Sequence, residues 1–453
     1  MQSSENKMGT MPVFRLLVTM ALPMIVSMMV QALYNIVDSI YVSRISENAL
    51  TAVSLAFPIQ NLMIAVGTGT GVGVGALLSR ALGEKNQKDA NRLAEHGCYL
   101  AALSYIAFLL IGLFGSRAFF AVQTDVPEIV EGGTEYMFIV TVFSFGLFTQ
   151  LIFEKLMQAT GRTVLSMLTQ GVGAVLNIIL DPIFIFTFDM GITGAAVATV
   201  AGQIIAAGFG IWLNTRYNRE IRLDPMHFRP QWSVIRRIYA IGVPSIIMAS
   251  IGSVMTFCLN RILIAFTETA AAVFGVYFKL QSFVFMPLFG VSNGMISILS
   301  YNYGARRKDR MMAVIRYTAG IALGFMLFGT VMMQLIPGPL LLLFNADENM
   351  LGIGIPALRI ISLSFPLAAF GITASSTFQA LGRGFLSMTI SIARQLVALV
   401  PIAWLMARFG TLSSVWLAFP LAELVSTTLA AVFLVHIYRR IIKPIAEPDA
   451  EVA

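Results

Sequence analysis

Charged residues are scarce in this sequence of 453 residues. Lys and Arg number 30 and Asp and Glu number 23, so 12% of the chain is charged, whereas 57% is hydrophobic. A soluble domain carries about a quarter charged residues and about half apolar ones. This scarcity excludes an ordinary soluble protein. The net charge of +7 is spread over many separate segments, so it does not indicate a nucleic-acid partner.

Residues that support catalysis or metal binding are also few. The two cysteines, Cys98 and Cys258, both lie in apolar stretches and are expected to pack there. The three histidines are scattered without metal-ligand spacing, and no nucleophile–histidine–acid set can be recognised. We therefore expect no enzyme, no metal and no cofactor.

The segment GTGTGVGVGALLSR, residues 67–80, superficially resembles a nucleotide-binding loop. It follows no predicted strand, and no Walker Lys-Ser/Thr pair comes after it. Gly67, Gly71 and Gly75 instead recur every fourth residue, which is typical of closely packed helices. The segment therefore predicts a helix-packing face and gives no indication of ATP binding.

Long apolar runs account for most of the sequence. Each is long enough for a membrane helix of about 20 residues, so we predict an all-α polytopic membrane protein with twelve transmembrane helices. The predicted segments are 13–42, 49–78, 92–115, 128–152, 158–187, 191–215, 233–266, 270–300, 312–336, 352–377, 382–407 and 412–437. The adjacent residues Glu154 and Lys155 follow one of these runs and are interpreted as a pair at the membrane interface.

Basic residues gather in alternate loops, notably 80–92, 216–237 and 306–316. Cytoplasmic loops carry the excess of Lys and Arg in membrane proteins. With twelve helices, this asymmetry predicts that both termini lie in the cytoplasm.

The sequence repeats itself at an offset of 221 residues. Pro23 falls on Pro244, and QATGRTVLSM (158–167) falls on QALGRGFLSM (379–388). A repeat of six helices gives two parallel bundles, with a central cleft between them as the expected substrate route. The predicted domains are an amino-terminal lobe (1–215), a cytoplasmic linker (216–232), a carboxy-terminal lobe (233–440) and a cytoplasmic tail (441–453).

Polar residues in the apolar runs fall on shared helix faces. Segment 13–42 carries four of them at i, i+3, i+4 and i+7, and segments 158–187 and 191–215 carry the others. Acidic groups inside a membrane are costly and are functional by default, although a structural role, with the acids paired to Asn177 or to a backbone donor, is the alternative. The residues are Gln31, Tyr34, Asn35 and Asp38; Gln170, Asn177 and Asp181; and Thr199 and Gln203.

The sequence resembles the bacterial multidrug and toxic compound extrusion (MATE) transporters over about residues 13–438. The resemblance is carried by ALPMIVSMMVQALYNIVDSIYVSRI, GVGVGALLSRALGEKNQKDA, QATGRTVLSMLTQGVGAVLNIILDPIFIF, GITGAAVATVAGQ and FKLQSFVFMPLFGVSNGMISILSYNYGARRKDR. It implies a multi-pass protein of the inner membrane that exports small cationic amphipathic compounds in exchange for protons or sodium.

The resemblance also implies roles for individual residues. Asp38, Asn177 and Asp181 match the ion-coupling positions of the family. The surrounding polar residues would form the substrate-binding surface; these are Gln31, Tyr34, Asn35, Thr199 and Gln203. One branch of the family uses acids in the segments that correspond here to GVPSIIMASIGSVMTFCLN and IISLSFPLAAFGITASSTFQ, and neither segment contains a carboxylate. Coupling is therefore expected in the amino-terminal lobe, in a protein that works as a monomer.

The carboxy-terminal lobe has a different polar set, namely Lys279, Arg394 and Glu423. These residues could form a structural cluster, or they could serve gating or substrate binding. The two cationic members keep open a second function, a flippase for an anionic lipid-linked precursor. The two acids of the amino-terminal lobe argue against that function.

Overall fold

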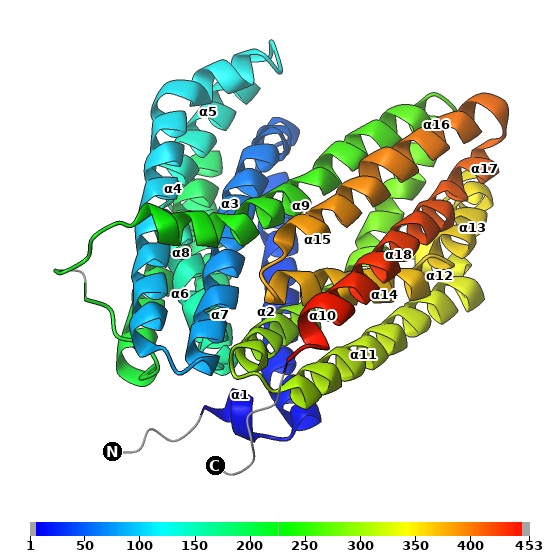
Figure 1. Ribbon diagram of the computed structural model, residues 1–453. Helices are drawn as coiled ribbons and strands as arrows, with labels where there is room; N and C mark the ends of the chain where they lie inside the picture. Colours follow the sequence, from blue (N-terminus) through cyan, green and yellow to red (C-terminus); the bar gives the residue numbers. More distant parts are fainter. Residues whose placement is uncertain (1–5, 225, 446–453) are drawn as a thin grey trace. The chain divides into compact units, whose positions relative to one another are not determined.

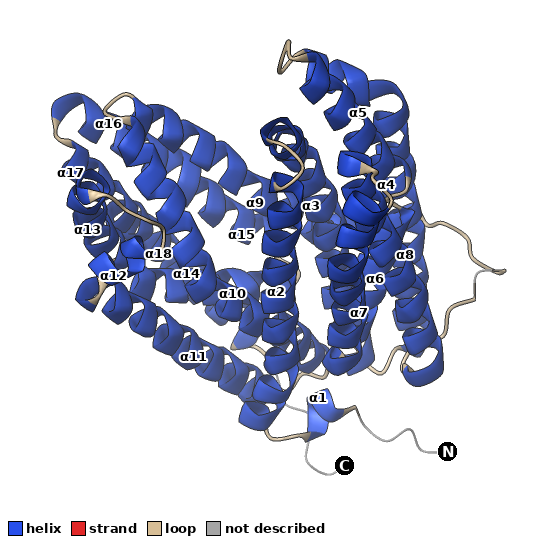
Figure 2. Cartoon of the chain, turned by 180° about the vertical axis from the view of Figure 1, so that it is seen from behind, coloured by secondary structure: helices blue, strands red, loops and turns tan. Residues whose placement is uncertain are grey.

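The computed structural model describes residues 6–224 and 226–445. Helices make up this part of the chain and no strand occurs in it (Figures 1 and 2). The helices, with π-helical segments marked η, are α1 (Lys7–Thr10), α2 (Val13–Ser43), α3 (Glu47–Gly83), α4 (Gln87–Ala121), α5 (Pro127–Val142), α6 (Phe145–Ala159), α7 (Thr163–Pro182), η1 (Ile183–Thr187), α8 (Gly191–Tyr217), α9 (Trp232–Ile264), α10 (Glu268–Gly304), α11 (Lys308–Leu335), α12 (Pro337–Leu342), α13 (Glu348–Ser362), α14 (Phe365–Ala380), α15 (Gly384–Ile392), η2 (Ala393–Leu399), α16 (Val400–Phe409), α17 (Leu412–Trp416), α18 (Ala418–Ile437) and η3 (Tyr438–Ile442).

Ten helical stretches within the described residues are long and apolar enough to cross a membrane, and two bent helix pairs bring the total to twelve. The prediction of an all-α polytopic protein is confirmed. The bent pairs are α5 with α6, at 46°, and α13 with α14, at 47°. Each pair lies in a segment that the sequence predicted as one unbroken run, because an apolar run carries no sign of a break.

The repeat of 221 residues extends to single hydrogen bonds. Ser79 Oγ donates to the Ala159 carbonyl at 2.8 Å, and Ser300 Oγ donates to the Ala380 carbonyl at 2.9 Å. Two tight turns are repeated as well, because Lys85 and Arg306 both have positive φ, at 56° and 55°. The second half therefore reproduces both the helix order and the turn geometry of the first.

The chain forms two compact units. Unit 1 comprises Met1–Asn6 and Leu22–Ile246, and unit 2 comprises Lys7–Ala21 and Ile247–Ala453. The helices α2 and α9 pass from one unit to the other beside Pro23 and Pro244, which are equivalent prolines of the repeat.

The predicted lobe boundaries at residues 215 and 233, and the central cleft, stay predictions. Pro225 of the predicted linker and residues 446–453 of the predicted tail lie outside the described residues.

Glycines in α3 bring two neighbouring helices close to it. A Cβ atom at Gly67 would lie 2.5 Å from Leu151 Cδ1, and one at Gly71 would lie 2.5 Å from Lys155 Cγ, both on α6. The predicted packing face is therefore confirmed at these positions. The intervening Gly73 faces α9, where an added Cβ would lie 2.4 Å from the Ile238 carbonyl oxygen. The restriction to glycine is strictest at Gly73, because an added Cβ there would meet backbone atoms and not the end of a flexible side chain.

The linker between α8 and α9 forms hydrogen bonds with α4 within unit 1. Side chains along the first turns of α4 pair with its backbone, and the buried His96 packs edge-on against Phe228. The hydrogen bonds run from Gln87 Nε2 to the Glu220 carbonyl, from Arg222 N–H to Asn91 Oδ1, from Asp224 N–H to Glu95 Oε1 and from Gln231 N–H to His96 Nε2. The segment is thus a part of unit 1 with defined contacts.

Candidate ion-coupling site

The helix α7 presents two buried polar side chains one turn apart. Asn177 is 3% exposed and Asp181 is fully buried. Asn177 Nδ2 lies 3.4 Å from Asp181 Oδ1 and 3.3 Å from Thr199 Oγ1 on α8, and it donates to both. Pro182 follows the acid and cannot donate a backbone hydrogen bond, and the helix continues as the π-helical η1. This irregular turn therefore lies directly beside the acid.

Asp38 on α2 joins this pair in unit 1. The carboxyl groups of Asp38 and Asp181 lie close enough to each other to interact electrostatically. Asp38 Oδ1, Asp181 Oδ2 and Asn177 Oδ1 are buried and receive no hydrogen bond from a donor group of the described residues. Asp38, Asn177 and Asp181, called here the candidate coupling site, thus gather acceptor oxygens from two helices.

The backbones of α7 and α8 approach closely next to this site. A Cβ atom at Gly202 would lie 3.0 Å from the Gly173 carbonyl oxygen and 3.5 Å from the Asn177 backbone nitrogen. Thr199, three residues before Gly202, therefore comes within reach of the Asn177 amide. One turn further, Gln203 has a buried Oε1 atom to which no described residue donates a hydrogen bond.

The other predicted substrate residues lie on α2 in varied surroundings. Gln31 accepts a hydrogen bond from Gln170 Nε2 at 2.9 Å, which connects α2 to α7. Tyr34 is half-buried and lies within electrostatic range of Asp38 and Asp181. Asn35 is exposed, and its carbonyl accepts a hydrogen bond from Ser39. The structure thus brings Gln31 and Tyr34 to the neighbouring helices or acids, whereas Asn35 faces away from the buried side of α2.

Tyr136 on α5 is a neighbour that the sequence analysis did not identify. It is 2% exposed, its hydroxyl accepts a hydrogen bond from Gln60 Nε2 at 2.9 Å, and it lies within electrostatic range of both Asp38 and Asp181. A tyrosine in an apolar run is usually a packing residue, so its spacing gave no signal. Its partner Gln60 recurs as Gln281 in the repeat.

Glu154 corrects the prediction of an interfacial pair. It is 5% exposed on α6 and accepts a hydrogen bond from Gln150 Nε2 at 2.9 Å. The apolar run appeared to stop at residue 152, but α6 continues to Ala159. Glu154 is consequently a buried acid of unit 1, and the Lys155 stem packs over Gly71.

The polar residues of unit 2 separate into two environments. Arg394 in η2 and Glu423 on α18 form an ion pair, with 3.6 Å between Arg394 Nη1 and Glu423 Oε2. Lys279 is exposed on α10, with its Nζ 5.7 Å from the centroid of the Phe344 ring. Of the three residues, only Arg394 and Glu423 are paired with each other. In the part of the chain that the structure describes, no group of three or more His, Cys, Asp or Glu residues could hold a metal ion.

Comparison with known proteins agrees with this arrangement. The MatE family profile matches residues 23–183 and again residues 244–405, once in each half of the repeat. The multidrug export protein MepA from Staphylococcus haemolyticus is 26% identical over 435 residues, which cover 94% of each chain. MepA from Staphylococcus aureus is 26% identical over 436 residues, again 94% of each chain.

Solved structures show the same fold. An outward-facing multidrug resistance MATE family transporter of the MOP superfamily has a TM-score of 0.92 at 26% identity, covering 98% of this chain and 100% of that one. A MOP superfamily transporter from Pyrococcus furiosus, described as having a binding pocket of reverse polarity, has a TM-score of 0.90 at 26% identity, covering 98% and 99%. The chain therefore belongs to the MatE family and is a multi-pass membrane transporter, not an enzyme.

Proposed function

We propose that this protein exports cationic amphipathic compounds in exchange for inward-moving protons, with sodium as the alternative coupling ion. The family membership and the multidrug export proteins among its relatives support this function. The observation that carries the proposal is the pair of neighbouring acids, Asp38 and Asp181, whose buried oxygens Oδ1 and Oδ2 receive no hydrogen bond from the described residues. Such a pair changes its charge when a proton binds or leaves.

The mechanism follows from competition at the candidate coupling site. A substrate cation near the site favours the charged carboxylates, and a proton removes that attraction. Binding of the two is linked reciprocally, so a high proton activity on the outer side favours release of substrate there. Asn177 holds Asp181 in place through its amide and is itself held by Thr199. The acceptor oxygens of the same site would suit sodium, since hard cations prefer oxygen ligands.

The available energy is sufficient for concentrative export. Each pH unit of gradient supplies about 1.4 kcal/mol per proton. A membrane potential of about 100 mV adds about 2.3 kcal/mol for each charge moved. One or two protons could therefore drive accumulation from tens-fold to thousands-fold.

The test is efflux of a fluorescent cation from vesicles containing the purified protein. A pH gradient and a sodium gradient are applied separately, at the same membrane potential. We expect the pH gradient to drive efflux and the sodium gradient to be ineffective. If only the sodium gradient drives efflux, the coupling ion is sodium and not the proton. If neither gradient drives efflux, the proposal of antiport is contradicted.

A flippase for an anionic lipid-linked precursor is less well supported. Such a substrate would need several cationic side chains at one site, whereas Arg394 is paired with Glu423 and Lys279 stacks on Phe344. The flippase is kept as the second candidate because the similar transporter from Pyrococcus furiosus is described as having a binding pocket of reverse polarity. Scrambling of a labelled anionic lipid by the purified protein, without a gradient, would favour the flippase.

We further propose a monomer in the cell membrane with both termini in the cytoplasm. The basic loops support this orientation. Single cysteines at Lys88 and Arg219, in a background without Cys98 and Cys258, would test it in intact cells. We expect no reaction with an impermeant thiol reagent from outside. Rapid labelling of either position would reverse the orientation.

A further inference from the structure

The ion pair in unit 2 lies where the helix is irregular. Arg394 is the second residue of the π-helical η2, and Glu423 lies on α18. Glu423 is 7% exposed, and its Oε1 atom accepts a hydrogen bond from Ser426 Oγ at 3.2 Å. π-helical turns within α-helices are frequent at functional sites. The position of Arg394 therefore suggests more than packing.

The pair uses only a part of what Arg394 offers. A guanidinium group has five N–H donors, and the separation of 3.6 Å from Glu423 is long for a charged contact. The Arg394 side chain is 28% exposed, whereas that of Glu423 is 9% exposed. A single contact of this length offsets little of the free-energy cost of removing two charges from water. Arg394 thus retains donors that can meet another acceptor.

The repeat shows that the fold does not require this pair. Shifted by 221 residues, Arg394 and Glu423 correspond to Gly173 and Gly202 in unit 1. Those glycines pack backbone against backbone, one helical turn from Asn177. Unit 2 therefore has charged side chains at the positions that adjoin the candidate coupling site in unit 1.

Two glycines pack near this part of η2 and α18. A Cβ atom at Gly371 would lie 3.5 Å from Glu423 Oε1, and one at Gly252 would have only Gln395 Oε1 near it, at 3.9 Å. Both are ordinary contact distances. At the position equivalent to Gly371, unit 1 has Gln150, whose amide is bonded to Glu154.

We propose that Arg394 binds the carboxylate of zwitterionic amphipathic substrates, and that Glu423 is the internal carboxylate which the substrate displaces. This inference rests on the proposed export function and adds a substrate class to it. The guanidinium plane can hold a carboxylate through two parallel hydrogen bonds. Glu423 keeps its bond from Ser426 when the substrate replaces it. Substrate and Glu423 thus compete for one cation.

A matched pair of dyes tests this competition. Rhodamine B carries a cationic ring system and a free carboxylate, and its ethyl ester carries the same ring system without the anion. Binding of each is measured to the purified protein in nanodiscs without any gradient. We expect Arg394→Gln to weaken the binding of rhodamine B by about tenfold, because the dye loses a charged hydrogen-bonded contact. Binding of the ester should stay within about twofold of the wild type.

The variant Glu423→Gln should have the opposite effect. It removes the competing carboxylate while its amide oxygen can still accept from Ser426, so rhodamine B should bind more tightly and the ester should be unchanged. If the role of the ion pair is purely structural, both variants should instead weaken the binding of both dyes. That result, or an unchanged ratio of the two dyes in Arg394→Gln, would overturn the inference.

A control arginine is available on the same candidate membrane span, Gly384–Phe409. Arg408 stacks over Trp404, with 5.4 Å between its Cζ atom and the ring centroid. Arg408→Gln should leave the ratio of the two dyes unchanged, and an equal change there would also count against a specific role for Arg394. Failure of the proposed function would look different, because the wild type would then not export the ester under any gradient.

Discussion

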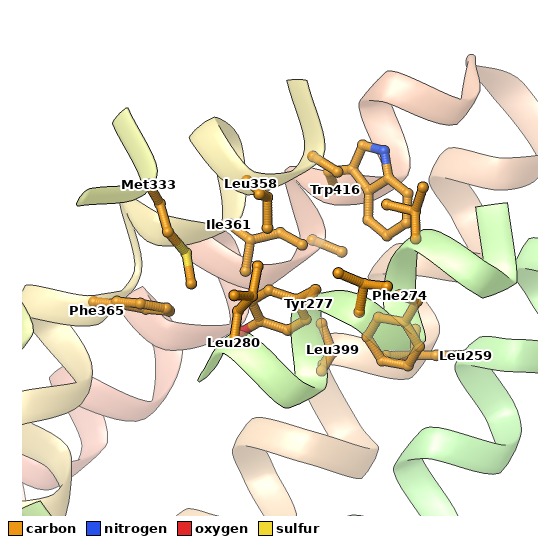
Figure 3. Close-up of a cluster of buried hydrophobic side chains, with 14 of the residues drawn as sticks. Leu259, Phe274, Tyr277, Leu280, Met333, Leu358, Ile361, Phe365, Leu399 and Trp416 are labelled. Atoms are coloured by element: carbon orange, nitrogen blue, oxygen red, sulfur yellow. The ribbon is translucent and has the colours of Figure 1, made fainter. Parts of the chain in front are cut away.

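The same positions of the repeat are polar in unit 1 and apolar in unit 2. Asp38 corresponds to Leu259, Asn177 to Ala398 and Asp181 to Ile402. Leu259 is 1% exposed and Ala398 is 5% exposed. Leu259 belongs to the buried cluster in Figure 3, where it lies beside the Phe274 ring. One helical framework thus accommodates a polar site in one unit and a hydrophobic core in the other.

The comparison shows that packing does not demand the acids. Unit 2 fills the equivalent space with hydrocarbon, which needs no hydrogen-bond partners. Unit 1 accepts buried carboxyl and amide oxygens that no described residue satisfies, although such groups cost about 1–3 kcal/mol each. A cost that the second copy avoids is best explained by function.

The largest expected change in stability comes from placing an acid at one of the equivalent apolar positions of unit 2. Leu259→Asp buries a carboxylate without a partner and should lower the free energy of unfolding by about 3–5 kcal/mol. Thermal unfolding of the purified protein in nanodiscs measures it. The reverse change, Asp38→Leu, should leave the unfolding temperature equal or higher. If Asp38→Leu were as destabilising as Leu259→Asp, the difference between the units would be structural.

Removing the charge from unit 1 should abolish coupling without disturbing the fold. Asp38→Asn keeps the shape of the side chain and should reduce efflux driven by a pH gradient by about 100-fold. The control is Asp189→Asn, an exposed loop position with φ of 52° that asparagine tolerates. Efflux at the wild-type rate in Asp38→Asn would remove this residue from the mechanism.

The glycine contact beside the site should tolerate little change. Gly202→Val adds bulk 3.0 Å from the Gly173 carbonyl and should cost about 1–3 kcal/mol while also slowing efflux. Gly208 lies on the same helix with nothing within 4 Å of an added Cβ, so Gly208→Ala should be neutral or slightly stabilising. Equal responses of unfolding temperature in the two variants would rule out the backbone contact as the cause.

The smallest change in stability is expected from a substitution in the linker between α8 and α9. A hydrogen bond from His227, at 2.8 Å, lowers the pKa of the Asp224 carboxyl below its ordinary value of 3.8. A lowered pKa contributes stability that is present above the unfolded value and is lost as the pH falls through the folded one. The slight difference in unfolding temperature between His227→Ala and the wild type should therefore vanish in strong acid. A difference that grows on acidification would contradict it.

The sequence predicted what depends on hydropathy and repetition. Twelve spans, the glycine face of α3 and the matching of the two halves all follow from periodic patterns along the chain. The burial of Glu154 could not be predicted, because its charge made the apolar run appear to end early. The contact of Tyr136 with Gln60 and the pairing of Arg394 with Glu423 join distant segments. Nothing local in the sequence indicates which helices face each other.

The helices α2 and α9 each have one end in unit 1 and the other in unit 2, and this division has a consequence for biosynthesis. Unit 1 needs residues up to Ile246, so it cannot be completed when the sixth span leaves the ribosome. Unit 2 needs Lys7–Ala21, which are made first. The carbonyl groups of Met8 and Met11 are bound in unit 2 by Arg310, which is made some three hundred residues later.

Met8 and Met11 therefore lack this partner until Arg310 has been synthesised. Domains usually fold as units during synthesis, the amino-terminal one first. In this protein neither unit is made from one continuous stretch of the chain. A polypeptide cut between the two halves would leave each fragment without the helix end that the other supplies.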